Sequence, residues 1–141
     1  MAAAIHRNPF LQKPAEYKTN PCVNMLRLIP IVGPLFGQSA SLQLAKEINY
    51  ENAKGNSKRL VDLIDHANVH RKLDICRQLI NLTVVISAVA FGIFSMNVFV
   101  VLYMAFVSLQ LVAHTGLLMH NMSVKKHVLL GDITKVRRLY C

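Results

Sequence analysis

The most constraining feature of this chain is a long stretch without charge. Residues 78–124 contain no Lys, Arg, Asp or Glu, although the whole chain has 16 Lys and Arg against 7 Asp and Glu. A water-facing helix keeps charged residues on its solvated face, so an uncharged stretch of this length is not typical of a soluble helix. Charged side chains are costly inside a bilayer. The stretch therefore predicts that the middle of the chain is inserted in a membrane.

The uncharged stretch consists of two apolar segments, 79–94 and 98–119, with Ser, Met and Asn at 95–97 between them. A bilayer core of about 30 Å is crossed by roughly 20 helical residues, so one helix over both segments, about 60 Å long, would be twice too long. The chain therefore has to reverse, and residues 95–97, preceded by Gly92, are typical of a turn. The sequence predicts an all-α integral membrane protein, in which amphipathic cytosolic helices precede a helical hairpin of two closely spaced transmembrane helices at 79–119.

Both flanks of the uncharged stretch are basic, and no charge lies between its two segments. Lys and Arg near the ends of spans stay on the cytosolic side, which predicts a hairpin whose two ends face the same cytosol. Because the first segment is slightly short for a full crossing, a shallow, wedge-like hairpin stays open. Basic side chains at a membrane surface attract anionic head groups, at about 1 kcal/mol each. The residues expected there are Arg71, Lys72, Arg77, Lys125, Lys126, Lys135, Arg137 and Arg138.

Small side chains in the first segment indicate how the two helices pack. Ala88, Gly92 and Ser95 follow one another at helical spacing, which predicts a stripe where a second helix approaches closely. Antiparallel pairing about a turn near residue 96 brings Ala88 beside Ala105. The residues expected at the helix–helix contact are Thr83, Ala88, Gly92, Ser95, Ala105, Gln110 and His114.

Polar residues inside the segments are expected to face the partner helix. The same pairing places Thr83 beside Gln110, and Gln110 and His114 lie four residues apart on one face. We expect Gln110 and His114 to hydrogen-bond toward Asn81 and Thr83 instead of facing lipid. Packing inside the hairpin or an oligomer is favoured over a transport or proton-relay role, because intramembrane polar residues indicate function mainly when they are ionisable.

The remaining chain divides by composition into regions on either side of the hairpin. The first region is polar, contains several prolines and lacks the apolar core of a secretory signal. The predicted organisation is a flexible leader at 1–22, a Pro/Gly-broken apolar segment with a short helix at 23–56, an amphipathic helix at 57–78, the hairpin at 79–119 and a basic tail at 120–141.

The apolar run at 28–37 contains two prolines and two glycines, which are expected to interrupt any helix there. It is too short to span a membrane. Two interpretations stay open: an interfacial or re-entrant membrane anchor, and a turn packed on neighbouring helices. A helix is predicted over 41–53, with a break at Gly55 and Asn56.

The region 57–78 has the pattern of an amphipathic helix capped by Ser57 and continuing directly into the first apolar segment. Its charged residues, Asp74 among them, are expected on a solvated face. The apolar stripe has to contact lipid, the 28–37 run or another chain, the last through a coiled-coil-like interface. The stripe consists of Leu60, Leu63, Ile64, Ala67, Leu73 and Cys76.

Motifs for chemistry are missing from the sequence. There is no nucleophile elbow, zinc-protease motif, phosphate-binding loop or Cys-His arrangement in a recognisable context, so we expect no enzyme. The three cysteines form no close pair, and no metal site or cofactor is predicted. A haem held by His114, His120 or His127 would require a partner chain, because the first segment has no histidine. Nucleic acid is not expected as a partner, since no motif or aromatic platform accompanies the basic tail.

The two closely spaced apolar segments, the N-terminus without a secretory signal and the shared side of both ends resemble the chlamydial inclusion membrane proteins. The run RLIPIVGPLFG at 27–37 is also similar to Pro/Gly-broken runs of chlamydial proteins. The resemblance implies type III secretion and insertion into the membrane of the pathogen's vacuole. It further implies that both ends face the host cytosol, where they recruit a host protein or tether membranes. The short tail without a long heptad repeat argues against a SNARE-like coiled coil.

Other membrane roles fit the same pattern. A holin-like pore also combines two spans with a basic tail and assembles as a homo-oligomer, but holins usually have few residues before the first span. A reticulon-like, membrane-curving hairpin fits the short first segment and the neighbouring amphipathic helix. If the chain is not secreted, the expected location is the bacterial inner membrane.

Overall fold

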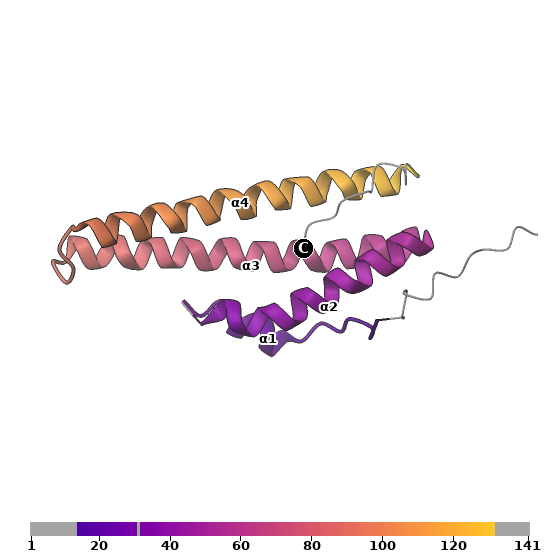
Figure 1. Cartoon of the computed structure of the whole chain (residues 1–141), viewed down its shortest axis with the longest axis horizontal. Helices are drawn as coiled ribbons and strands as arrows, with labels where there is room; N and C mark the ends of the chain where they lie inside the picture. The colour runs from indigo at the N-terminus through magenta and orange to yellow at the C-terminus, as the bar shows by residue number, and fades with distance from the viewer. Residues whose placement is uncertain (1–13, 31, 132–141) are drawn as a thin grey trace, which may run out of the picture.

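The structure is a computed structural model that describes residues 14–30 and 32–131. It contains α1 (Pro21–Leu26), α2 (Gly33–Lys54), α3 (Ser57–Ala90) and α4 (Val98–Leu129). The long helices α3 and α4 run antiparallel, and α2 lies along the first part of α3 (Figure 1). All regular structure in the described residues is helical, which confirms the all-α prediction.

Helix α2 begins earlier than predicted. The expectation that the glycines and prolines of 28–37 interrupt any helix is wrong from Gly33 onward, because Pro34 stands in the first turn, where a proline needs no helical hydrogen bond. The predicted break after α2 is confirmed. Gly55 ends α2 with a left-handed φ of 75°. Ser57, which was predicted to cap α3, is instead its first residue, and the Asn56 side chain caps α3 by accepting a hydrogen bond from the Arg59 amide.

Helix α3 is continuous from the amphipathic region into the first apolar segment, as predicted. It ends at Ala90, four residues before the predicted end of that segment. Gly92, at φ 71°, then turns the chain, and the amides of Gly92 and Ile93 donate to carbonyls of the last helical turn, Val89 and Ala88. Asn97 caps α4 through its side chain. The reversal therefore takes the whole of residues 91–97 instead of 95–97.

A hydrophobic core lies at the end of α3 that is far from this reversal. Four residues of the apolar stripe predicted for 57–78 are buried there against α2 and α4: Leu60, Leu63, Ile64 and Ala67. Leu73 is half-buried. The expected contacts of this stripe were lipid, the 28–37 run or another chain, and the core residues of α2 and α4 are none of these. Asp74 and Arg77 are buried, whereas Cys76 is exposed, so the predicted positions of Asp74 and Cys76 are wrong. The core consists of Tyr17, Leu44, Ile48, Leu60, Leu63, Ile64, Ala67, Val124 and Val128. We call this packed end of the molecule the helical head.

The opposite end of the α3–α4 pair is not covered by other described elements. Both helices extend past α1 and α2 to the reversal (Figure 1). Their large apolar side chains are mostly exposed, including Leu102 at 60%, Leu109 at 68% and Val112 at 69%. We call residues 79–112 the projecting hairpin. Both α3 and α4 are long and apolar enough to cross a membrane, judged by length and composition.

Candidate membrane-insertion site

Three buried charged residues lie at the base of the projecting hairpin. Arg27, from the turn after α1, forms two parallel hydrogen bonds to the Asp74 carboxylate, from Nε at 3.0 Å and from Nη2 at 2.9 Å. Arg77 Nη1 lies 3.1 Å from the same carboxylate and also donates to the Arg27 carbonyl. The three side chains are at most 9% exposed. We call this cluster the ionic base.

The electrostatics of the ionic base favour a charged Asp74. Burial alone would raise the pKa of this carboxyl, but the hydrogen bonds and charge of Arg27, together with the charge of Arg77, outweigh burial and lower the pKa. Asp74 therefore stays ionised and neutralises part of the charge of the two arginines. Arg77, expected at the membrane surface, is instead inside this cluster.

Two glycines of α2 make room for Arg27. A Cβ atom on Gly37 would lie 2.9 Å from Arg27 Cζ, and one on Gly33 would lie 2.9 Å from the Arg27 carbonyl carbon. Such separations are well inside van der Waals contact. Arg27 therefore lies on the surface of α2 at Gly33 and Gly37, which are one helical turn apart.

We expect Gly33→Ala to destabilise the fold. The added methyl group collides with the backbone of Arg27 instead of with a flexible side-chain tip, so the turn that carries the ionic base has to move. Overpacking of this kind lowers the free energy of unfolding by about 1–3 kcal/mol. Denaturant titration of the protein in detergent micelles measures this change. Gly116→Ala is the control, since nothing lies within 4 Å of a Cβ there, and an equal loss in both variants would contradict the expectation.

Polar side chains connect α3 to α4 above and below the ionic base. Gln78 donates to Gln110, and Asn81 donates to Gln78 over 3.2 Å. Nearer the head, Arg71 and His114 lie within hydrogen-bond distance at 3.0 Å. These bonds leave the polar groups facing the partner helix, as expected, but with partners other than those expected.

The predicted register of the helix pair is wrong. Gln110 pairs with Gln78 and not with Thr83, whose exposed hydroxyl donates to the carbonyl of Leu79 in its own helix. The difference of five residues, about 1.4 helical turns, arises because α3 ends at Ala90, so that the reversal at 91–97 is centred earlier in the chain than the predicted turn at 95–97.

Of the small residues expected at the contact between α3 and α4, only Ala88 is buried. Ala105 is exposed, and the buried residue of α4 within the projecting hairpin is Val107. Gly92 and Ser95 belong to the reversal and not to a helical stripe, and a Cβ on Gly92 would meet nothing within 4 Å. Among the described residues, the close approach predicted at Gly92 is therefore not made.

The basic residues expected at the membrane surface lie in different environments. Lys125 forms an ion pair with Asp65, at 2.6 Å, and Lys72 and Lys126 are exposed. Lys135, Arg137 and Arg138 lie outside the described residues.

The end of α1, the turn after it and the start of α2 present exposed apolar side chains near the ionic base. Met25 is 75% exposed and Leu35 71%, and Ile29 and Phe36 are also exposed. We call residues 25–30 and 32–36 the elbow. Gly33 and Gly37 of the 28–37 run pack on Arg27, which agrees with a turn packed on its neighbours, and the large apolar side chains of the elbow are exposed. The interpretation as a membrane anchor stays a prediction.

Residues 14–20, predicted to be part of a flexible leader, are held against the head by Tyr17. The Tyr17 amide donates to Glu47 at 2.5 Å, and its hydroxyl lies 2.8 Å from His70 Nε2. Tyr17 is 6% exposed and its ring also contacts His66. Sequence reasoning missed this contact, because a single tyrosine among prolines carries no periodic pattern.

Burial of His70 makes the head sensitive to acid. Burial, followed by the positive charge of Arg27, lowers the pKa of His70 to about 4, against 6.5 in the unfolded chain. The unfolded state therefore binds a proton that the folded state does not, and stability is lost as pH falls from about 6.5 to about 4. Unfolding midpoints measured across this range should decline in the wild type and decline less in His70→Gln. Parallel declines would show that His70 is not responsible.

The chain matches no protein-family model, no curated protein and no solved structure. A functional proposal therefore has to start from its own geometry. The two helices long and apolar enough to cross a membrane are the two that carry the projecting hairpin. Their length and composition are compatible with membrane insertion.

Proposed function

We propose that this protein is a non-enzymatic membrane protein that inserts its projecting hairpin into a bilayer and holds the helical head at the surface on one side. The exposed head then recruits a partner protein or organises the membrane. Lipid surrounds the hairpin, and anionic head groups neutralise nearby basic side chains such as Lys72 and Lys126.

The observation that carries the proposal is the contrast between the two ends of the α3–α4 pair. The head has a buried apolar core and ion pairs such as Lys125–Asp65 and Arg59–Glu47, as in a water-soluble fold. The projecting hairpin instead exposes large apolar side chains along both helices. Soluble monomers rarely expose an apolar surface of this extent, and a hydrocarbon environment removes its cost.

The choice of membrane rests on the resemblance to the chlamydial inclusion membrane proteins. It supports secretion by a type III system and insertion into the vacuole membrane, with both ends of the chain in the host cytosol. The bacterial inner membrane is the alternative location.

Immunofluorescence in infected cells tests this location. An antibody to the last residues of the chain is applied after permeabilising only the plasma membrane. A rim of signal around the vacuole is expected. Signal that is confined to the bacterial envelope and seen only after bacterial lysis would contradict the vacuolar location and favour the alternative.

A membrane-curving wedge is a second candidate, favoured by the length of the hairpin. Between Arg77 in the ionic base and Ala90 at the end of α3, a helix rises only about 20 Å, less than the roughly 30 Å of a bilayer core. The apolar elbow lies beside this segment and widens the inserted part. Tubulation of liposomes without release of trapped dye would favour the wedge, whereas dye release that depends on oligomers would favour a holin-like pore.

A further inference from the structure

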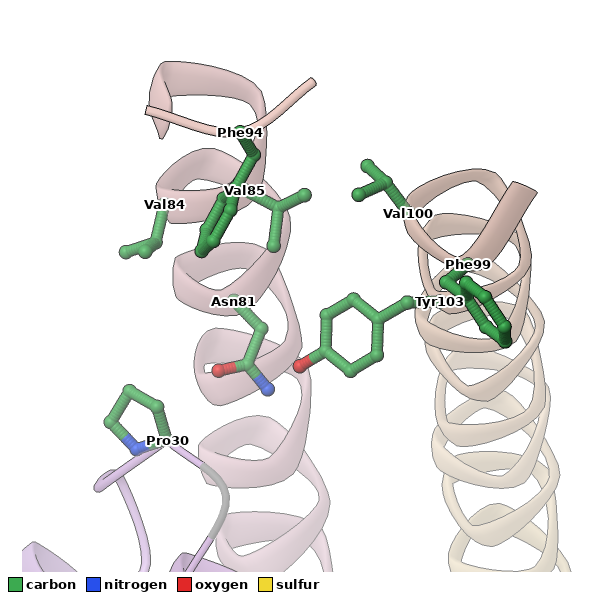
Figure 2. A pocket seen from close by; sticks show the side chains of 8 residues that line it. All are labelled: Pro30, Asn81, Val84, Val85, Phe94, Phe99, Val100 and Tyr103. Carbon is green, nitrogen blue, oxygen red and sulfur yellow. The ribbon is translucent and has the colours of Figure 1, made fainter. Parts of the chain in front are cut away.

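A groove of about 380 Å³ opens between α3 and α4 on the projecting hairpin. Its wall is formed by both helices, by Phe94 of the reversal and by Pro30 of the elbow (Figure 2). Asn81 and Tyr103 bring the polar groups of its lining, and the other lining residues are apolar. The groove thus lies where the hairpin would be surrounded by lipid.

The polarity of the groove changes along its length. Asn81 stands one turn beyond Arg77 of the ionic base, and the Tyr103 hydroxyl points toward the Asn81 amide from the opposite helix (Figure 2). Phe94 and Val100 line the groove nearer the reversal. The polar end therefore faces the membrane surface and the apolar end faces the bilayer interior.

We propose that this groove binds one acyl chain of a membrane phospholipid. The Tyr103 hydroxyl donates a hydrogen bond to the ester carbonyl, and the hydrocarbon tail runs past Val100 and Phe94 toward the reversal. This direction matches a phospholipid whose head group lies level with the ionic base. The inference rests on the proposed function, because it requires the hairpin to be in a bilayer.

A photoreactive phospholipid tests the proposal. The full-length protein is reconstituted in phosphatidylcholine vesicles that contain a phospholipid with a diazirine on one acyl chain, and labelled residues are mapped by mass spectrometry. Groove residues should be labelled several-fold more than Val101 and Leu102, which are exposed on α4 at the same depth but do not line the groove. Equal labelling of both sets would overturn the proposal.

Two substitutions on α4 separate the groove from the general apolar surface. Val100→Trp fills the groove and should reduce its labelling several-fold, whereas Val101→Trp, at a position that is 50% exposed and outside the groove, should leave it unchanged. Tyr103→Phe removes only the hydroxyl and should weaken the preference for groove residues about two- to tenfold. Unchanged labelling in Val100→Trp would overturn the proposal.

Two further measurements show which of the two proposals a negative labelling result contradicts. Flotation of the vesicles reports insertion: protein that does not float and is labelled nowhere overturns the proposed function as well. Protein that floats but shows uniform labelling overturns only the acyl-chain site. Chemical cross-linking into dimers that is lost in Val100→Trp and kept in Val101→Trp would show that a second copy of the chain occupies the groove. This result would overturn the acyl-chain proposal.

Discussion

Asp74→Asn is expected to lower the free energy of unfolding by about 3–5 kcal/mol. The substitution removes the one carboxylate that both Arg27 and Arg77 contact and leaves two guanidinium groups buried without a counter-charge. Removing one partner of a buried ion pair is strongly destabilising for this reason. Denaturant titration in detergent micelles, followed by helical circular dichroism, measures the change.

Asp62→Asn is the matched control for this prediction. Asp62 also contacts an arginine, Arg59 at 2.7 Å, but its side chain is 53% exposed. Exposed ion pairs typically contribute 0.2–1 kcal/mol, so the control should lose about that much. A loss of similar size in the two variants would show that the ionic base is solvated and does not hold the elbow on α3.

Leu102→Arg should reduce membrane insertion by about 2.5–3.5 kcal/mol, the cost of an arginine near the centre of a transmembrane helix. Leu102 is 60% exposed on α4 and has no acidic neighbour among the described residues of the projecting hairpin. A cost of this size changes the insertion equilibrium by about two orders of magnitude. The fraction of protein that floats with vesicles after reconstitution reports it.

The control for insertion is the same substitution at the other end of α4. Leu129 is 66% exposed but belongs to the helical head, next to basic residues of the last turn. Leu129→Arg should therefore float like the wild type. If both variants lost insertion equally, general destabilisation and not lipid contact at Leu102 would explain the result.

The features that the sequence predicted well are those encoded by local patterns. The uncharged stretch and its polar break predicted two long helices joined by a reversal, and Gly55–Asn56 predicted the end of α2. The stripe of apolar residues after Ser57 predicted an amphipathic helix there, although not the contact of that stripe with α2 and α4. Periodicity and breakers act within a few turns, so one sequence is sufficient to detect them.

The ionic base was not predicted, because its residues are distant in sequence. Arg27 and Asp74 are 47 positions apart, and nothing local distinguishes Asp74 from the other charges of its helix. Gly33 and Gly37 were interpreted as helix breakers, although their function in the fold is to accommodate Arg27 on the surface of α2. The register error has a similar origin, since small changes in the length of a reversal shift every contact that follows.

Depth-dependent quenching of a single tryptophan tests the central claim, that the projecting hairpin lies in lipid and the helical head does not. The chain contains no tryptophan, so Leu102→Trp and Leu129→Trp each introduce one reporter. In vesicles of phospholipids brominated on the acyl chains, we expect strong quenching and blue-shifted emission at position 102, and water-like, unquenched emission at 129. Equal quenching at both positions, or none at 102, would contradict the claim.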